Sequence, residues 1–377
     1  MSDPHAQQSP PAAAGFEPPP YPYDRLADLH KVADTCAGGA VDLSIGTPCD
    51  PPPDAVIDAL ASSGAERGYP PSVGTPAFRE AAAAWLGRRF GAVVEPAQVA
   101  ACVGTKELVA GVPQWLHLRR PERDTVLYPH VSYPTYAMGA ILAGCRPVPY
   151  RALDAIAPDD AARALCLWVN SPGNPTGELV DLAEAAAWGR DHGVPVLSDE
   201  CYIEFTWDGP GRTILAEGAE GVVALHSLSK RSNFAGARVG FYAGDGDLVH
   251  YLSEVRKHAG FMVPGPVQAA AVVAFGDDAH VDLQRERYLR RLDLLAMSLC
   301  EFGVLCARPP ATFYLWVAAP DGDAWALAHR LATEGGAIVS PGEFYGPDGA
   351  GHVRIAVVQP DDRVELVANR LGAAVRG

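Results

Sequence analysis

Lys230 lies in the stretch HSLSKRSNFAGARVGF (226–241), in a chain that contains few lysines. Only Lys31, Lys106 and Lys257 accompany it, and the other 26 of the 30 basic residues are arginines. A composition this biased uses arginine wherever a positive charge is enough. The retained lysines are therefore candidates for chemistry that needs an amine, which can lose its proton and attack a carbonyl.

The neighbours of Lys230 suggest which carbonyl compound it meets. The apolar run VVALHS (222–227) predicts a strand that leads directly into SLSK, so Lys230 should emerge at the carboxyl edge of a sheet, where ligands bind. Ser227, Ser229 and Arg238 lie close by in sequence and can hold a phosphate. An amine beside phosphate ligands suits pyridoxal 5'-phosphate, a phosphorylated aldehyde. The alternative for SxSK alone is an inert surface lysine.

A carboxylate follows a second predicted strand, in SDECY (198–202). Asp199 can pair with a protonated pyridine nitrogen and keep the ring able to accept electrons, and Tyr202 can donate to the ring's phenolate oxygen. The alternative is a helix N-cap aspartate.

Two turns complete the set of candidates. NSPGNPTG (170–177) can present the amide of Asn174 to the same phenolate oxygen, although turn formation alone also explains its prolines and glycines. GTKEL (104–108) places Thr105 and Lys106 at a strand-to-helix junction, where helix amides can bind a phosphate. The alternative there is an ordinary threonine N-cap.

The elements that must position these residues alternate along the chain. Helical patterns such as 181–193, which ends at glycine, separate short apolar runs, and this alternation predicts an α/β fold with a buried, mostly parallel sheet. The predicted strands are 99–103, 125–129, 164–170, 194–199, 222–227 and 238–244. After Pro264 a long charged helix (about 279–302) precedes mixed strands and a helix, which indicates a second, smaller α+β domain.

Bulk composition excludes several classes of protein. The 377 residues are 48% apolar and carry a net charge of −15, which argues against a nucleic-acid partner. The eight cysteines are scattered without a CxxC pair, so we expect neither disulfides nor a metal site. No apolar run is long enough to cross a membrane, and residues 1–20 lack the blocks of a signal peptide. We expect a cytoplasmic protein with a disordered arm at 1–20.

The motifs together resemble those of the fold-type I, class I/II aminotransferases, from about residue 22 to the end. The matching stretches are SIGTP (44–48), GYPPSVGTPAFR (68–79), GTKEL, YPTY (133–136), NPTG (174–177), DECY (199–202), SLSK with Arg238, and HVRIA (352–356). Within this family the chain is most similar to actinobacterial succinyldiaminopimelate aminotransferases, which act in lysine biosynthesis. The resemblance implies a large cofactor-binding domain (45–265), a small domain (21–44 and 266–377) and a homodimer.

The resemblance also implies roles for individual residues. Lys230 forms the Schiff base with pyridoxal 5'-phosphate and acts as the general base, and Asp199 pairs with the pyridine nitrogen. Tyr202 and Asn174 bind the phenolate oxygen. Arg354 grips the substrate α-carboxylate, and Gly46 lets the backbone approach it. The residues implied to stack on the ring or bind the phosphate are Tyr133, Thr105, Lys106, Ser227, Arg238 and, from the partner subunit, Tyr69.

The substrates implied are glutamate as amino donor and N-succinyl-2-amino-6-oxopimelate as acceptor. Such an acceptor carries several carboxylates, so basic groups should surround it; the candidates are Arg231, Arg256, Lys257, His258 and the side chain of Lys106. The alternative for residues 256–258 is a solvated helix face. Departures from the subgroup at Gly173, Arg231, Phe234 and Ala237 leave open a paralogue for another oxo acid, such as a guanidino one. A carbon–sulfur β-lyase uses the same constellation and is the other alternative. No DNA-binding module fits in the N-terminal arm, so a transcriptional regulator is set aside.

Overall fold

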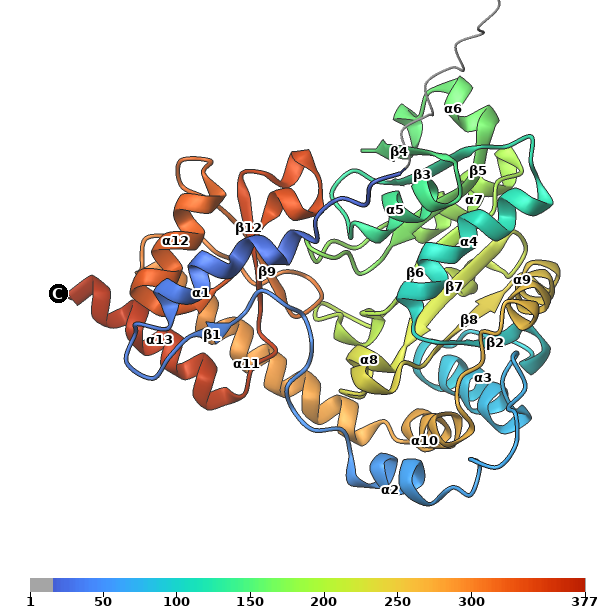
Figure 1. Ribbon diagram of the computed structural model, residues 1–377, viewed down its shortest axis with the longest axis horizontal. Helices are drawn as coiled ribbons and strands as arrows, with labels where there is room; N and C mark the ends of the chain where they lie inside the picture. The colour runs from blue at the N-terminus through green and yellow to red at the C-terminus, as the bar shows by residue number, and fades with distance from the viewer. Residues whose placement is uncertain (1–15, 377) are drawn as a thin grey trace, which may run out of the picture.

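The computed structural model describes residues 16–376, which fold around a seven-stranded sheet (Figure 1). Its strand order is β2-β8-β7-β6-β5-β3-β4, and only β8 runs antiparallel to its neighbours. The bounds are β2 Val99–Cys102, β3 Thr125–Pro129, β4 Arg146–Tyr150, β5 Ala164–Asn170, β6 Val196–Asp199, β7 Val222–Ser227 and β8 Gly240–Gly244. The predicted central, mostly parallel sheet is confirmed.

The sheet is buried because helices cover both of its faces. Consecutive residues of β7 illustrate the alternation: Val223 packs into one apolar cluster and Ala224 into the other. One cluster is closed by α4 Thr105–Arg119, α5 Thr135–Leu142 and α9 Gly246–His258. The other is closed by α2 Asp54–Ser62, α3 Pro76–Phe90, α7 Leu182–His192 and α10 Gly265–Gly276. The short α6 Pro158–Arg163 precedes β5.

Local signals in the sequence explain where α7 begins and ends. Asp181 is its N-cap and accepts hydrogen bonds from the amides of Ala183 and Glu184, both at 3.0 Å. Gly193 ends the helix in the left-handed conformation, with φ of 59°. The predicted helix at 181–193 is therefore confirmed, with its first and last residues serving as the caps.

One strand differs from the prediction at a residue that matters for the site. We predicted a strand from Arg238 to Gly244, but β8 begins only at Gly240. Arg238 has a φ of 57°, in the left-handed region that non-glycine residues rarely adopt, so it cannot extend the strand. Arg238 instead follows the 3₁₀ turn Ala235–Ala237, and its guanidinium group packs against Gly104, which lies just after β2.

A second region packs beside the sheet (Figure 1). It contains an antiparallel sheet in the order β11-β12-β9 and a short parallel pair, β1 with β10, and both share one apolar cluster with the surrounding helices. The strands are β1 Val41–Asp42, β9 Tyr314–Ala318, β10 Ala337–Ile338, β11 Ser340–Pro341 and β12 His352–Ala356. The helices are α1 Ala27–Ala33, α11 Ala279–Glu301, α12 Ala324–Gly335 and α13 Asp361–Arg376. The long helix α11 matches the predicted one and reaches from α10 into this region (Figure 1).

The predicted domain boundaries stay a prediction. The apolar cluster of the second region contains residues from 26–43 as well as from the C-terminal part of the chain. In contrast, α10 packs with the large sheet. Of the predicted disordered arm, residues 1–15 lie outside the described residues, and residues 16–20 are exposed and form no helix or strand. Across residues 16–376, no helix has the length and apolar character that crossing a membrane requires.

Candidate active site

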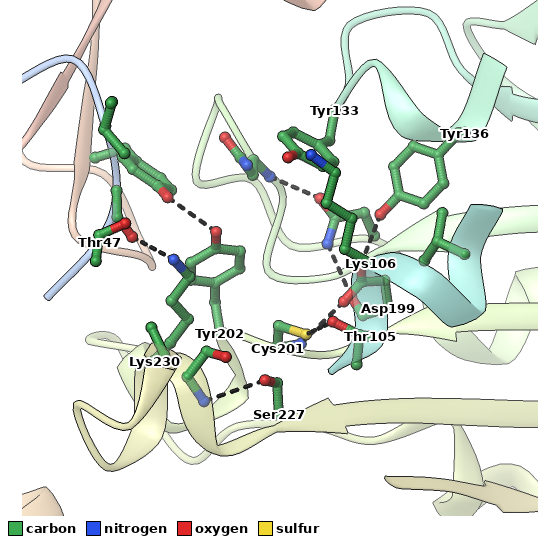
Figure 2. Close-up of a pocket in the computed structure, with 18 of the residues that line it drawn as sticks. Thr47, Thr105, Lys106, Tyr133, Tyr136, Asp199, Cys201, Tyr202, Ser227 and Lys230 are labelled. Atoms are coloured by element: carbon green, nitrogen blue, oxygen red, sulfur yellow. Dashed lines mark hydrogen bonds between the residues drawn. The ribbon is translucent and has the colours of Figure 1, made fainter. Parts of the chain in front are cut away.

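A cavity of about 440 Å³ opens at the carboxyl ends of the parallel strands, between the large sheet and the second region (Figure 2). It is lined by every residue to which the family resemblance gives a role in cofactor or α-carboxylate binding, with the exception of Tyr69. These are Gly46, Thr105, Lys106, Tyr133, Asn174, Asp199, Tyr202, Ser227, Lys230, Arg238 and Arg354. The side chain of Tyr69 is 99% exposed, and its predicted place in a partner's site stays a prediction.

Lys230 reaches the cavity from α8 (Leu228–Arg231), a single turn that follows β7. Ser227 caps this turn by accepting a hydrogen bond from the amide of Ser229 at 3.1 Å. The amine of Lys230 donates to the carbonyl oxygen of Gly46. Burial lowers the pKa of Lys230 to about 8, and the nearby guanidinium groups of Arg354 and Arg238 act in the same direction. A fraction of the amine is therefore neutral, and nucleophilic, near neutral pH.

We expect replacement of Lys230 by methionine to stabilise the cofactor-free protein at pH 7. The unfolded chain titrates Lys230 near 10.5 and the folded chain near 8, so between these values the unfolded state binds more protons and stability rises with pH. Below pH 8 Lys230 is charged in the folded protein, and its burial lowers the free energy of unfolding. Because the methionine variant also loses the hydrogen bond to Gly46, its net gain in unfolding free energy should be roughly 2–3 kcal/mol.

Urea unfolding of wild type and Lys230→Met checks this expectation. The variant should be more stable at pH 7 and lose that advantage at pH 10.5. Lys257→Met is the matched control, because Lys257 is 59% exposed and should show no such pH dependence. Equal destabilisation of Lys230→Met at both pH values would contradict a buried, destabilising charge.

Asp199 is the last residue of β6, and two donors orient its carboxylate toward the cavity. The hydroxyl of Tyr136 donates to Oδ2 at 2.9 Å, and the amide of Cys201 donates to Oδ1 at 3.2 Å (Figure 2). Burial raises the pKa of Asp199 in spite of these donors. A cation beside this carboxylate would offset that burial, so the group is suited to hold a protonated ring nitrogen.

The N-terminus of α4 forms the floor of a polar recess. Its N-cap, Gly104, has a φ of 73° and no side-chain cap, so the first amides of the helix are free to bind a ligand. A Cβ at Gly104 would lie 2.3 Å from a guanidinium nitrogen of Arg238, which shows how closely that arginine packs over the helix end. Thr105 and Ser227 line the same recess. Amides, hydroxyls and one guanidinium together fit a phosphate.

Arg354, on β12, is held from three sides. Its terminal nitrogens donate to Asn174 Oδ1 at 2.9 Å, to the carbonyl of Ser44 at 2.5 Å and to the hydroxyl of Tyr23 at 3.3 Å. Its guanidinium carbon lies 4.2 Å from the ring centroid of Tyr314. The residue is 2% exposed, and its Nε has no hydrogen-bond partner among the described residues. A rigid, buried guanidinium facing the cavity suits a carboxylate ligand.

Sequence reasoning missed several residues of the site. Tyr136 was within the quoted YPTY motif, and Asn170 was within NSPGNPTG. Asn170 binds the backbone of both Asn174 and Asp199, with distances of 2.8 and 2.9 Å, and so joins two strand ends. The others that line the cavity are Tyr21, Tyr23, Ile45, Thr47, Val109, Cys201, Ala235 and Tyr314, whereas Ser229, which also lines it, was predicted as a phosphate ligand.

Tyr202 and Gly46 have neighbours that the sequence did not reveal. The hydroxyl of Tyr202 lies 2.9 Å from that of Tyr314, and burial raises the pKa of Tyr202 well above its ordinary value, so it remains a neutral phenol. A Cβ at Gly46 would lie 2.0 Å from the hydroxyl of Tyr314. Close packing against Tyr314 is therefore a reason for glycine in SIGTP.

Most of the basic residues predicted to surround a polyanionic substrate do not reach the cavity. Arg256 is buried and binds both carboxylate oxygens of Glu107, at 2.7 and 2.8 Å. Lys257 pairs with Glu254 on an exposed helix face, and His258 is exposed. Arg231 is buried in an ion-pair cluster behind the site. These four predictions are wrong because Arg231 and Arg256 already have internal partners and Lys257 and His258 lie on an exposed helix face, neither of which the sequence alone shows. Of the five candidates only Lys106 lines the cavity.

Comparison with known proteins matches the chain to aminotransferases. The family model described as aminotransferase class I and II matches residues 39–371. The chain is 42% identical to 4-dedimethylamino-4-oxo-anhydrotetracycline transaminase OxyQ of Streptomyces rimosus, over 94% of this chain and 99% of that protein. It is 43% identical to the probable aminotransferase Rv1178 of Mycobacterium tuberculosis, over 94% and 85%.

Among solved structures, a probable N-succinyldiaminopimelate aminotransferase of Thermus thermophilus superposes with a TM-score of 0.82. It shares 32% sequence identity, and the alignment covers 93% of this chain and 99% of that one.

Proposed function

The chain belongs to the class I and II aminotransferases, which depend on pyridoxal phosphate, and on that premise we propose that it transfers the amino group of glutamate to an oxo acid at the cavity around Lys230. One observation carries this proposal. A single cavity contains an amine with a lowered pKa, a partly buried carboxylate and a buried guanidinium, on Lys230, Asp199 and Arg354 respectively. These are the groups that the reaction needs at the amino group, at the ring nitrogen of the cofactor and at the α-carboxylate of the substrate, respectively.

The cofactor, when bound, supplies the carbonyl that accepts the amino group and a ring that delocalises the electrons of the substrate α-carbon. In the proposed mechanism Arg354 fixes the α-carboxylate. Asp199 holds a proton at the ring nitrogen, oriented by Tyr136. The Nζ atom of Lys230, neutral in part at physiological pH, would take the proton from the substrate α-carbon and return it to the carbon on the other side of the substrate nitrogen, a 1,3-shift. Tyr202 and Asn174 would donate to the phenolate oxygen, and Tyr133 would stack on the ring.

We propose that the recess at the start of α4 holds the phosphate. The amides of Thr105 and Lys106, the hydroxyl of Ser227 and the guanidinium of Arg238 supply the donors. Tyr69 of the partner subunit would complete this set, so the proposed active unit is a homodimer. The nearly complete exposure of Tyr69 in the single chain leaves its hydroxyl available for such a contact.

For the acceptor we propose N-succinyl-2-amino-6-oxopimelate, which places the enzyme in lysine biosynthesis. The motifs of the sequence and the name of the Thermus neighbour support this choice. Lys106 is the group that would bind the distal carboxylate. Its Nζ lies 5.5 Å from the ring centroids of both Tyr21 and Tyr133. Burial lowers its pKa, but the tyrosines outweigh this and the net shift is upward, so Lys106 is charged at neutral pH.

A second acceptor class is favoured by the aromatic wall of the cavity. Tyr21, Tyr23 and Tyr133 line it, and tyrosine faces suit a planar, ring-bearing ketone. The relative OxyQ is named as a transaminase for a substrate of that shape, an oxo-anhydrotetracycline. A guanidino substrate has less support, because Asp199 is the single carboxylate among the described residues that line the cavity. Nothing in the cavity favours the β-lyase alternative.

A Lys106→Met variant tests the choice between these acceptors. Loss of one charge-assisted contact should raise the KM for N-succinyl-LL-diaminopimelate about 10- to 30-fold and leave the KM for aromatic amino acids within about 3-fold.

The acceptor class is also tested by the change in visible absorbance when the enzyme is mixed with glutamate, succinyldiaminopimelate, arginine, cystathionine and aromatic amino acids. A response to ring-bearing amines with none to succinyldiaminopimelate would replace the first acceptor by the second, and pyruvate release from cystathionine would indicate a lyase.

A further inference from the structure

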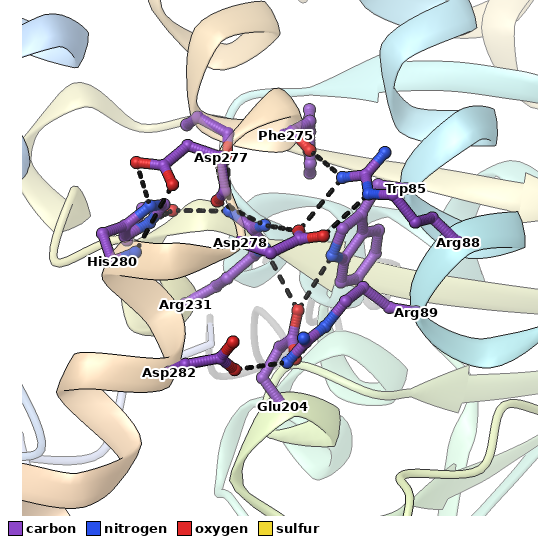
Figure 3. Close-up of polar contacts among 12 residues, drawn as sticks. Trp85, Arg88, Arg89, Glu204, Arg231, Phe275, Asp277, Asp278, His280 and Asp282 are labelled. Atoms are coloured by element: carbon purple, nitrogen blue, oxygen red, sulfur yellow. Dashed lines mark hydrogen bonds and ion pairs between the residues drawn. The ribbon is translucent and has the colours of Figure 1, made fainter.

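Arg231 follows Lys230 directly, yet its side chain points away from the cavity into the cluster of ion pairs in Figure 3. The residue is 2% exposed, and each of its guanidinium nitrogens has a partner. Nε donates to Glu204 Oε1 at 3.3 Å, NH1 to Ser232 Oγ at 3.1 Å and Ala274 O at 2.6 Å, and NH2 to Asp277 O at 3.2 Å and Asp278 Oδ1 at 3.1 Å. Arg231 is therefore fixed in position and orientation.

Its main anionic partner, Glu204, belongs to the segment that carries Asp199. Glu204 lies in the 3₁₀ turn Ile203–Phe205, immediately after Tyr202, and is 3% exposed. It also accepts hydrogen bonds from Trp85 Nε1 at 2.9 Å and from Arg89 NH2 at 2.8 Å (Figure 3). The contact between Arg231 and Glu204 thus joins two segments that are separate in sequence but meet at the cavity.

The turn that carries Lys230 needs such a contact. With only four residues, α8 forms too few internal hydrogen bonds to hold its own position. Apolar packing would allow a single turn to slide or rotate, whereas the planar fork of an arginine accepts only a narrow range of orientations. Burial of a charged pair adds little net stability, so specification of geometry is the better explanation for its presence.

We propose that the Arg231–Glu204 pair is a positioning device that sets the place of Lys230 relative to Asp199. It touches neither substrate nor cofactor and acts through the two residues that do. The inference rests on the roles proposed above for Lys230 and Asp199. It gives a function to the arginine that follows the reactive lysine, which sequence analysis assigned wrongly to the substrate.

The test compares Arg231→Gln, Arg231→Lys and Glu204→Gln with the control Arg88→Gln, all as cofactor-loaded protein. Arg88 shares the carboxylate of Asp278 but contacts neither Glu204 nor α8 in the described residues. Misplacing Lys230 should lower kcat about 30-fold in Arg231→Gln while KM for glutamate changes less than about 3-fold. Arg88→Gln should behave as wild type.

A second readout does not depend on turnover. The visible absorbance of the bound cofactor titrates with pH, and its midpoint should move by at least about half a pH unit in Arg231→Gln and Glu204→Gln. The titratable or charged groups that face Lys230 are Asp199, Cys201, Arg238 and Arg354, and none of them is altered by these variants. Arg231→Lys keeps the positive charge but lacks the planar guanidinium group. Its stability should therefore be close to that of wild type, and the midpoint of its absorbance titration should lie between those of wild type and Arg231→Gln.

The double variant Glu204→Gln/Arg231→Gln completes a cycle. If the two residues act as one device, it should lose no more in kcat than either single variant. Folded single variants with the kcat and the titration midpoint of wild type would overturn the inference. Losses in kcat that simply add up in the double variant would also overturn it. Should Arg231→Gln fail to fold, as judged by circular dichroism, the kcat and titration midpoint of Arg231→Lys and Glu204→Gln test the inference in its place.

An unchanged visible band in Lys230→Met would instead overturn the proposed function itself.

Discussion

Lys230→Met should abolish transamination, with a loss of at least about 10⁵-fold in kcat, because no other amine occupies its place in the proposed reaction. Lys106, the other lysine that lines the cavity, lies against the rings of Tyr21 and Tyr133. Methionine is an unbranched side chain close to lysine in length, and it has no amine. The measurement is single-turnover conversion of glutamate to 2-oxoglutarate, together with the visible absorbance of the bound cofactor, which should lose its long-wavelength band.

Lys257→Met makes the same chemical change on an exposed helix face and should retain wild-type turnover. Because the cofactor-free Lys230→Met protein is expected to be more stable than wild type at pH 7, inactivity cannot then be attributed to unfolding. A variant that kept its visible band and more than about 1% of wild-type turnover would show that the reactive lysine is elsewhere.

Asp199→Asn should lower kcat/KM for glutamate about 10³-fold or more, while the cofactor remains bound through the phosphate recess. An amide of the same shape carries no charge to hold a proton at the ring nitrogen, and a loss of about 4 kcal/mol of transition-state stabilisation corresponds to that factor. Steady-state kinetics and cofactor content measured on the same preparation separate loss of catalysis from loss of binding.

The control for this variant is Asp247→Asn, which removes an exposed carboxylate paired with Arg119 on the outer side of the molecule. It should have no effect on kcat/KM. Tyr136→Phe removes one of the two donors to Asp199 and should have a smaller effect than Asp199→Asn. Near-wild-type rates in Asp199→Asn would mean that this carboxylate only caps the turn after β6.

The parts of the fold that could be predicted are those set by local pattern. Strands β3, β5 and β7 have the predicted limits, because each is a mostly apolar run, and β5 and β7 are buried along their whole length. The strand β4 was not predicted. Its sequence, RPVPY, contains two prolines, which indicate a loop unless the strand lies at the edge of a sheet, as β4 does.

Site residues could be predicted where a short motif indicates the role of one residue. They could not be predicted where the role depends on a contact with a residue that is distant in sequence. Lys230, Asp199 and Asn174 each end or follow a strand, and strand ends meet at one edge of a parallel sheet. Tyr314 lies in one of the strands expected after Pro264, and nothing in its local sequence indicates its contacts with Tyr202 and Arg354. Likewise, the pairing of Arg256 with Glu107 spans most of the large sheet's sequence, so composition could not separate it from a substrate-binding cation.

The two walls of the cavity come from different parts of the chain, and this has a consequence for evolution. The groups proposed to carry the chemistry stand on the large sheet and on β12, whereas Tyr21, Tyr23 and Ile45 precede the first strand of that sheet. Tyr21 and Ile45 are more than two-fifths exposed, so mutations there cost little stability. Gene duplication followed by drift in this short leading segment could therefore produce new acceptor preferences while leaving the transamination machinery inherited intact.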